Sequence, residues 1–138
     1  MSENISTPAP PMRILYLEDN PLIAFHVEQM IEDLGHVFAG AMDSFAELKK
    51  QFASLEIDGA LIDIDLADGA TGPAAAAWLN ERGIPSIFVT GQRQVAAEHG
   101  DVSLAIITKP VSQVELAEKL RLFRPDHRPV VSGCASDR

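Results

Sequence analysis

Residues 60–72, ALIDIDLADGATG, decide the fold of this chain. The apolar run Gly59–Ile64 predicts a buried strand, with Asp63 close to its end. The Asp68-Gly69 and Thr71-Gly72-Pro73 steps that follow predict a loop. An acidic residue that ends an apolar strand costs free energy unless it is paired or functional. Asp63 is therefore the first candidate for a functional residue.

The chain alternates between apolar runs and helical patterns on both sides of this stretch. Asn20 and Ser112 are good N-caps, and Gly35 and Gly83 end helical patterns. Continuous apolar strands that alternate with helices predict a parallel sheet covered on both faces, an α/β doubly wound fold. The expected strands are 13–17, 37–41, 59–64, 86–90 and 104–108, and the expected helices are 21–34, 44–52, 73–82, 92–99 and 112–123.

The 138 residues amount to one domain, which we place at 12–124 between flexible tails at 1–11 and 125–138. The net charge of −9, from 11 Lys and Arg against 20 Asp and Glu, argues against binding to nucleic acid or to anionic membranes. The single cysteine, Cys134, excludes a disulfide within the chain. The N-terminus lacks the pattern of a signal peptide. We therefore expect a cytoplasmic protein.

Several strands of the predicted sheet deliver polar groups to one edge. Glu18-Asp19 ends the first strand, Asp63 ends the third with Asp65 just beyond, Thr90 ends the fourth and Lys109 ends the fifth. Ligands of such sheets bind at the carboxyl ends of the strands. Crowded carboxylates repel each other, and a divalent cation such as Mg²⁺, which prefers oxygen ligands, relieves that repulsion. A carboxylate beside a metal, a lysine and a hydroxyl is a chemically competent acceptor of a phosphoryl group.

These residues and their order resemble the response-regulator receiver family, of CheY-like fold. The resemblance covers residues 12–124 and rests on ILYLEDNP, ALIDIDLADGATG, IFVTG and IITKP. It implies a flavodoxin-like strand order, 2-1-3-4-5, and a cis Lys109-Pro110 bond. It also implies phosphorylation of Asp63, phosphoryl contacts from Thr90 and Lys109, and magnesium held by Glu18, Asp19, Asp63 and the main-chain carbonyl of Asp65.

The sequence Phe88-Val89-Thr90-Gly91 is similar to the Phe-X-Thr-Gly signature of the FATGUY subfamily of single-domain regulators. That resemblance implies a histidine kinase partner, of HWE-type or a related type, in a two-component phosphorelay. Ile106 stands where the family usually has an aromatic switch residue. We therefore expect a signalling protein rather than an enzyme, with no output domain, that acts through protein contacts or as a phosphate sink. The kinase, the downstream target, the phosphoryl lifetime and the oligomeric state stay open.

Two alternatives belong to other functional classes. The first is a receiver-like interaction module that accepts no phosphate, which Ile106 and the short fourth helix favour. The second is an aspartyl-phosphate phosphatase of the haloacid dehalogenase type, with Asp63 as nucleophile and Asp65 as general acid. Those enzymes carry Asp-X-Asp on the first strand, whereas Asp63 is on the third. We expect Trp78 to serve in packing. His26, His36 and His99 have no metal-ligand spacing, and His127 lies in the predicted C-terminal tail.

Overall fold

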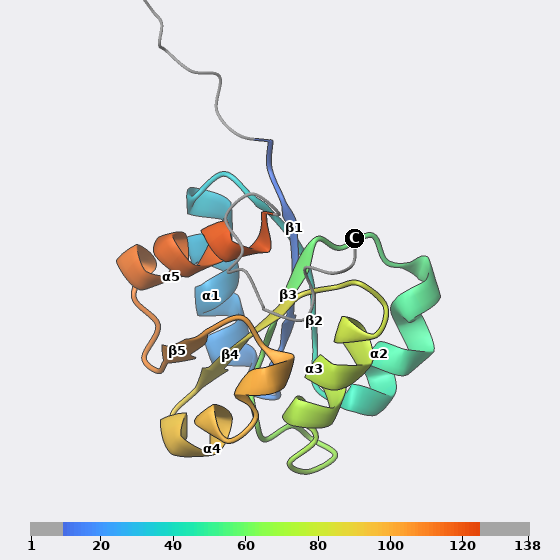
Figure 1. The fold of residues 1–138 in the computed structure, drawn as a ribbon. Helices are drawn as coiled ribbons and strands as arrows, with labels where there is room; N and C mark the ends of the chain where they lie inside the picture. The colour runs from blue at the N-terminus through green and yellow to red at the C-terminus, as the bar shows by residue number, and fades with distance from the viewer. Residues whose placement is uncertain (1–9, 125–138) are drawn as a thin grey trace, which may run out of the picture.

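The computed structural model describes residues 10–124, and the tail residues 1–9 and 125–138 lie outside the described part. The sheet has five parallel strands in the order β2-β1-β3-β4-β5, as predicted. Figure 1 shows this sheet in the middle of the domain, with helices on both of its faces. The strands are β1 (Arg13–Leu17), β2 (Val37–Met42), β3 (Gly59–Ile62), β4 (Ser86–Thr90) and β5 (Ile106–Thr108). The α-helices are α1 (Pro21–Asp33), α2 (Phe45–Gln51), α3 (Gly72–Asn80), α4 (Arg93–Ala97) and α5 (Gln113–Leu120).

The helices begin where the sequence supplies capping side chains. The Asn20 side chain accepts hydrogen bonds from the main-chain N–H groups of Leu22 and Ile23 at the start of α1. Ser112 caps α5 by accepting from the N–H of Glu115 at 3.1 Å. Such side chains satisfy N–H groups that have no partner inside the helix. The helix starts near 21 and 112 are therefore determined locally.

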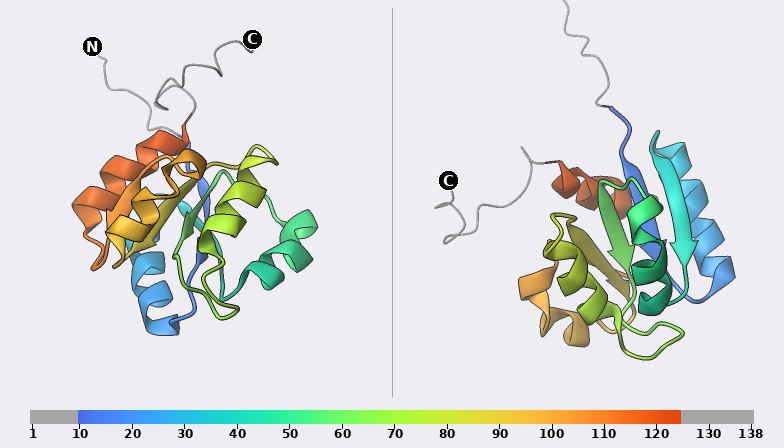
Figure 2. Two further views of the ribbon diagram at one scale, coloured as in Figure 1. Left: turned by 60° about the horizontal axis from the view of Figure 1, so that its bottom comes forward. Right: turned by 90° about the vertical axis from the view of Figure 1, so that its right-hand side faces the viewer.

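Two apolar layers hold the helices against the sheet. One layer packs α1 and α5 on one face, with buried Ile14, Tyr16 and Val89 from the strands. The other packs α2, α3 and α4 on the opposite face, with buried Leu17 and Phe88. Successive strand residues point to opposite faces, which explains why Tyr16 and Leu17 enter different layers. Both views of Figure 2 show helices on either side of the strands.

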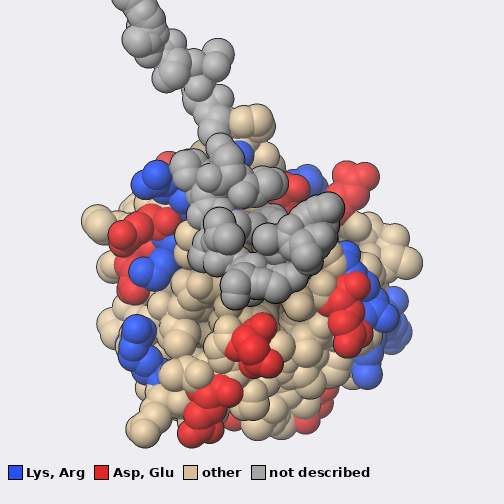
Figure 3. Space-filling model, in the orientation of Figure 1, with Lys and Arg blue, Asp and Glu red and all other residues tan. Residues whose placement is uncertain are grey.

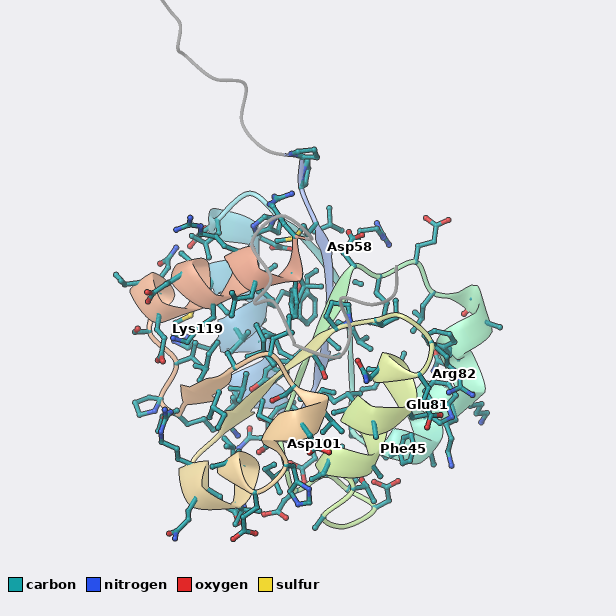
Figure 4. The ribbon with its side chains drawn as sticks, in the orientation of Figure 1. Phe45, Asp58, Glu81, Arg82, Asp101 and Lys119 are labelled. Carbon is teal, nitrogen blue, oxygen red and sulfur yellow. The ribbon has the colours of Figure 1, made fainter. Side chains whose placement is uncertain are left out.

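The Trp78 ring packs between α2 and α3, as expected from the sequence. It makes edge-on contacts with the rings of Phe45 and Phe52, at centroid distances of 6.1 and 5.1 Å. The Arg82 guanidinium lies 3.7 Å from the Trp78 ring centroid. Figure 4 labels Phe45 and Arg82 on this side of the molecule.

The fourth helix and the fifth strand are shorter than predicted. A helix was expected over 92–99, but α4 covers only Arg93–Ala97 and a 3-10 turn, Gly100–Val102, follows it. Gln92 at its N-cap makes no capping hydrogen bond through its side chain, so the first turn lacks that support. The fifth strand was expected from residue 104, but the ladder with β4 covers only Ile106–Thr108.

Gly59, at the start of β3, offers a test of the packing. A Cβ atom at this position would lie 2.4–2.6 Å from atoms of the Phe123 ring, which is buried. We expect Gly59→Ala to lower the free energy of unfolding by about 1–3 kcal/mol, because the ring has no room to move away. Gly100→Ala is the matched control, since a Cβ there meets nothing within 4 Å. Urea denaturation of both variants measures the effect, and equal stabilities would contradict this packing.

Candidate functional site

The ammonium group of Lys109 joins two carboxylates at the carboxyl edge of the sheet. Its Nζ lies 2.7 Å from Oε1 of Glu18 and 2.8 Å from Oδ2 of Asp63. The three residues follow the ends of β1, β3 and β5, so the parallel sheet brings them together from positions up to 91 residues apart. Glu18 and Asp63 are buried, and Lys109 is partly covered. The peptide bond between Lys109 and Pro110 is cis, as the resemblance implied.

The carboxylate of Glu18 is held by three hydrogen-bond donors. Its Oε1 accepts from the Tyr16 hydroxyl at 2.9 Å and from Lys109, and its Oε2 accepts from the main-chain N–H of Asn20 at 3.1 Å. Burial raises the pKa of Tyr16, and the Glu18 carboxylate raises it further, so the phenol stays protonated and donates. Tyr16 was not among the residues predicted for the site. Its position two residues before Glu18 on one strand was a usable signal, because such residues share a face of the sheet.

The carboxylate of Asp63 accepts fewer hydrogen bonds than the carboxylate of Glu18. Its Oδ1 accepts from the N–H of Ile64 at 2.7 Å, and its Oδ2 binds Lys109. Burial raises the pKa of Asp63 above its ordinary value, Lys109 opposes this rise, and the Glu18 carboxylate adds to it. The pKa of Lys109 is also raised, because its contacts with Asp63 and Glu18 outweigh the effect of burial. Two carboxylates against one ammonium leave one negative charge in the cluster.

The other predicted site residues lie around this cluster. Asp19 is exposed and makes no hydrogen bond or salt bridge within residues 10–124. Thr90 is buried, and its hydroxyl accepts from the N–H of Gln92 at 2.9 Å. The Asp65 side chain turns toward the β4–α4 loop, where it accepts a hydrogen bond from the Gln92 amide. Gln92 therefore joins two loops of the site, a role that the sequence did not reveal.

Gly72 fixes the main chain behind Asp63. Its N–H donates to the carbonyl of Ile64 at 2.9 Å, and a Cβ atom at Gly72 would lie only 2.0 Å from the carbonyl oxygen of Asp63. Only a residue without a side chain allows the start of α3 to come this close. Gly72 was predicted only as part of a loop, and this contact was not expected from the sequence.

The donors at this edge suit a magnesium ion. Asp19, Asp63 and the carbonyl of Asp65 supply oxygen atoms, and Mg²⁺ usually binds one or two carboxylates and keeps several waters. Within the described residues, no three acidic, histidine or cysteine side chains gather closely enough to form a complete metal cage. The predicted acidic side chains Glu18, Asp19 and Asp63 therefore do not form a closed three-ligand metal site in this structure. The residual charge of the cluster together with Asp19 is −2, which one divalent ion would balance.

Comparison with known proteins identifies the family. Residues 14–121 match the response regulator receiver domain, and the chain belongs to this family. The strand order and the position of Asp63 after β3, not after the first strand, also disagree with the phosphatase alternative. Across residues 10–124, no helix has the length and apolar character needed to cross a membrane.

Several relatives share the name PhyR. The chain is 35% identical over 101 residues to the phyllosphere-induced regulator PhyR of Methylorubrum extorquens, covering 70% of this chain and 38% of that protein. The chain thus spans well under half the length of this relative. The receiver domain of PhyR from Erythrobacter litoralis superposes with a TM-score of 0.74 at 25% identity, covering 88% of this chain and 96% of that domain. The anti-anti-sigma factor PhyR of Bartonella quintana gives a TM-score of 0.72 at 28% identity, covering 80% of this chain and 47% of that one.

The raised pKa of Asp63 predicts that its ionised form costs stability. A group whose pKa is raised on folding stabilises the fold below its unfolded pKa, and this stabilisation is lost as the pH rises through the folded value. In metal-free buffer at pH 7, we therefore expect Asp63→Asn to be more stable than the parent chain. The gain is about 1.4 kcal/mol for each unit by which the pKa is raised.

Thermal unfolding between pH 3 and 7 measures this difference, which should vanish at the acid end, where Asp63 is protonated. Asp101→Asn removes one exposed carboxylate and serves as the control, with no change expected. A parent chain that is more stable than the Asp63→Asn variant at pH 7 would show that Lys109 outweighs burial.

Proposed function

We propose that this receiver domain accepts a phosphoryl group on Asp63 from a histidine kinase, in a magnesium-dependent step of a phosphorelay. The observation that carries the proposal is the contact of Lys109 with both Glu18 and Asp63. Lys109 keeps Asp63 oriented and partly offsets the charge of the buried carboxylate. Thr90 ends strand β4 and pairs with Thr108 of the neighbouring strand β5. Lys109 follows Thr108 directly in the chain.

In the proposed reaction, a carboxylate oxygen of Asp63 attacks the phosphorus of a phosphohistidine. The new P–O bond gives an acyl phosphate, the P–N bond breaks, and the kinase histidine leaves with the electron pair. Lys109 and the hydroxyl of Thr90 would hold oxygens of the transferred group. A bound Mg²⁺ would neutralise charge on those oxygens in the transition state. Asp19, Asp63 and the carbonyl of Asp65 are the proposed direct ligands, whereas Glu18, whose oxygens already accept three hydrogen bonds, would hold Lys109 in place.

An apolar surface beside Lys109 supports the approach of a partner protein. A hollow of about 540 Å³ lies between α1 and the β5–α5 loop, and its lining includes Leu22, His26 and Val111. Leu22 is 79% exposed, and Val114 at the start of α5 is 81% exposed. Exposed large apolar side chains next to a reactive group are typical of interaction sites. We propose this surface as the place where the phosphodonor docks.

Phosphorylation of Asp63 is directly testable. Incubation with acetyl phosphate and Mg²⁺ should add one phosphoryl group, detected by mass spectrometry of the intact chain. Asp63→Asn should abolish the addition, because the amide cannot form the acyl phosphate, whereas the exposed control Asp101→Asn should label as the parent chain does. Labelling of Asp63→Asn would place the acceptor elsewhere. If the parent chain accepts no phosphate from acetyl phosphate or from a histidine kinase, the non-phosphorylated interaction module becomes the better description.

The proposed output route runs through the β4–α4 loop. Thr90 accepts from the N–H of Gln92, and the Arg93 guanidinium donates to the hydroxyl of Thr108 at 3.1 Å, so a shift of Thr90 toward a phosphoryl group would reach α4 and β5. We expect phosphorylation, or beryllofluoride as its analogue, to change amide hydrogen exchange most in residues 91–103. The short helix α4 can reorder there at low cost.

Residues 45–54, in α2 and the following 3-10 turn, serve as the internal control and should change little. Gln92→Ala should reduce the response of 91–103, because the variant lacks the side-chain link to Asp65. If only residues next to Asp63 respond, the domain transmits no change along this route, and the phosphate-sink role is favoured.

A further inference from the structure

A second hollow of the domain lies along the free edge of the sheet. It is a groove of about 730 Å³ between α1 and α2, and β2 forms its floor. The right-hand view of Figure 2 shows β2 at this edge, between the two helices. One end of the groove reaches Glu18 and Asp19, and the remainder extends away from the phosphoacceptor site along residues 39–43. The proposed phosphoryl transfer leaves this part of the groove without a role.

The floor and one wall of this groove are suited to contact with another chain. β2 is an edge strand, so among residues 10–124 one side of its main chain has no neighbouring strand. Its residues Ala39, Gly40 and Ala41 are small, which leaves the main chain accessible. The opposite wall carries Phe25 of α1, a large ring that is 60% exposed. An exposed aromatic ring over an open strand edge is a surface that a partner can cover.

The charge of the groove defines what kind of partner fits. Its lining contains five carboxylates and neither lysine nor arginine: Glu18, Asp19, Glu28, Asp43 and Glu47. Within residues 10–124, Glu18 is the one member of this set that forms a salt bridge. The face of the molecule in Figure 3, by contrast, carries basic as well as acidic groups, which adjoin each other toward its left and right rims. The groove therefore has a local negative charge that no cation of its own lining offsets.

We propose that the groove binds a short basic segment of a partner protein. An apolar side chain of this segment would pack on Phe25, and basic side chains would face Glu28, Asp43 and Glu47. The floor residues 39–43 extend over about 16 Å at roughly 3.3 Å per residue, which fits about five residues of an extended segment. A second copy of this chain is a poor occupant, because each copy carries a net charge of −9. The three carboxylates that would face the basic side chains, Glu28, Asp43 and Glu47, take no part in the proposed phosphoryl transfer.

The test uses a short fluorescein-labelled peptide of alternating lysine and valine, with a glutamine–valine peptide as the uncharged comparison. The double variant Glu28→Gln/Glu47→Gln removes two charges of the groove. The double variant Glu98→Gln/Asp101→Asn removes two exposed charges near α4, outside the groove, and is matched in net charge. Fluorescence anisotropy should show about fivefold weaker binding for the groove variant and little change for the control.

Phe25→Ser should also weaken peptide binding while the chain stays folded, since the ring is mostly exposed. Amide chemical shifts should move in residues 39–43 when the peptide is added.

The proposal is overturned if the two double variants lose the same amount of affinity for the peptide, because that result indicates general attraction to an acidic protein. It is also overturned if no saturable binding is observed. If sedimentation shows that the parent chain forms dimers and that only the groove variants lose them, the groove binds a second copy of the chain instead. Acetyl phosphate labelling of the groove variants, with Asp63 intact, checks the phosphoacceptor function separately.

Discussion

The contact of one lysine with two buried carboxylates is the interaction on which the site depends. Glu18 and Asp63 come from neighbouring strands, and without Lys109 their charges would meet unshielded at the edge of an apolar sheet. Each of the two carboxylates also accepts a further hydrogen bond that partly offsets its burial, from the Tyr16 hydroxyl on Glu18 and from the Ile64 N–H on Asp63. One negative charge remains in the cluster, and the proposed magnesium binding and phosphoryl transfer depend on it.

The sequence was sufficient for the features that follow from strand order. Apolar runs predicted β1 and β4 with the bounds that the structure shows, and a parallel sheet then required Glu18, Asp63 and Lys109 to meet at one edge. These predictions succeed because the side-chain pattern and the right-handed connections leave few alternatives. The family match over residues 14–121 agrees with the predicted fold.

The features that the sequence could not predict depend on loop conformation. The hydrogen bond between Gln92 and Asp65 joins residues of two loops, and no periodicity specifies their approach. The bounds of α4 also escaped prediction, because its first turn has no capping side chain and a few residues can leave the helix at little cost. The contact of Gly72 with Asp63 required the path of the whole β3–α3 loop.

The close approach of Gly72 has a mechanical consequence for this site. On the α3 side, the main chain of Gly72 packs directly on the main chain of Asp63, so there is no space into which Asp63 could move. On the α4 side, its neighbours are held by side-chain hydrogen bonds of Thr90 and Gln92, which can exchange partners. Asp63 therefore has a rigid main-chain support on the α3 side and exchangeable side-chain hydrogen bonds on the α4 side. A displacement at Asp63 would be accommodated more easily toward α4 than toward α3.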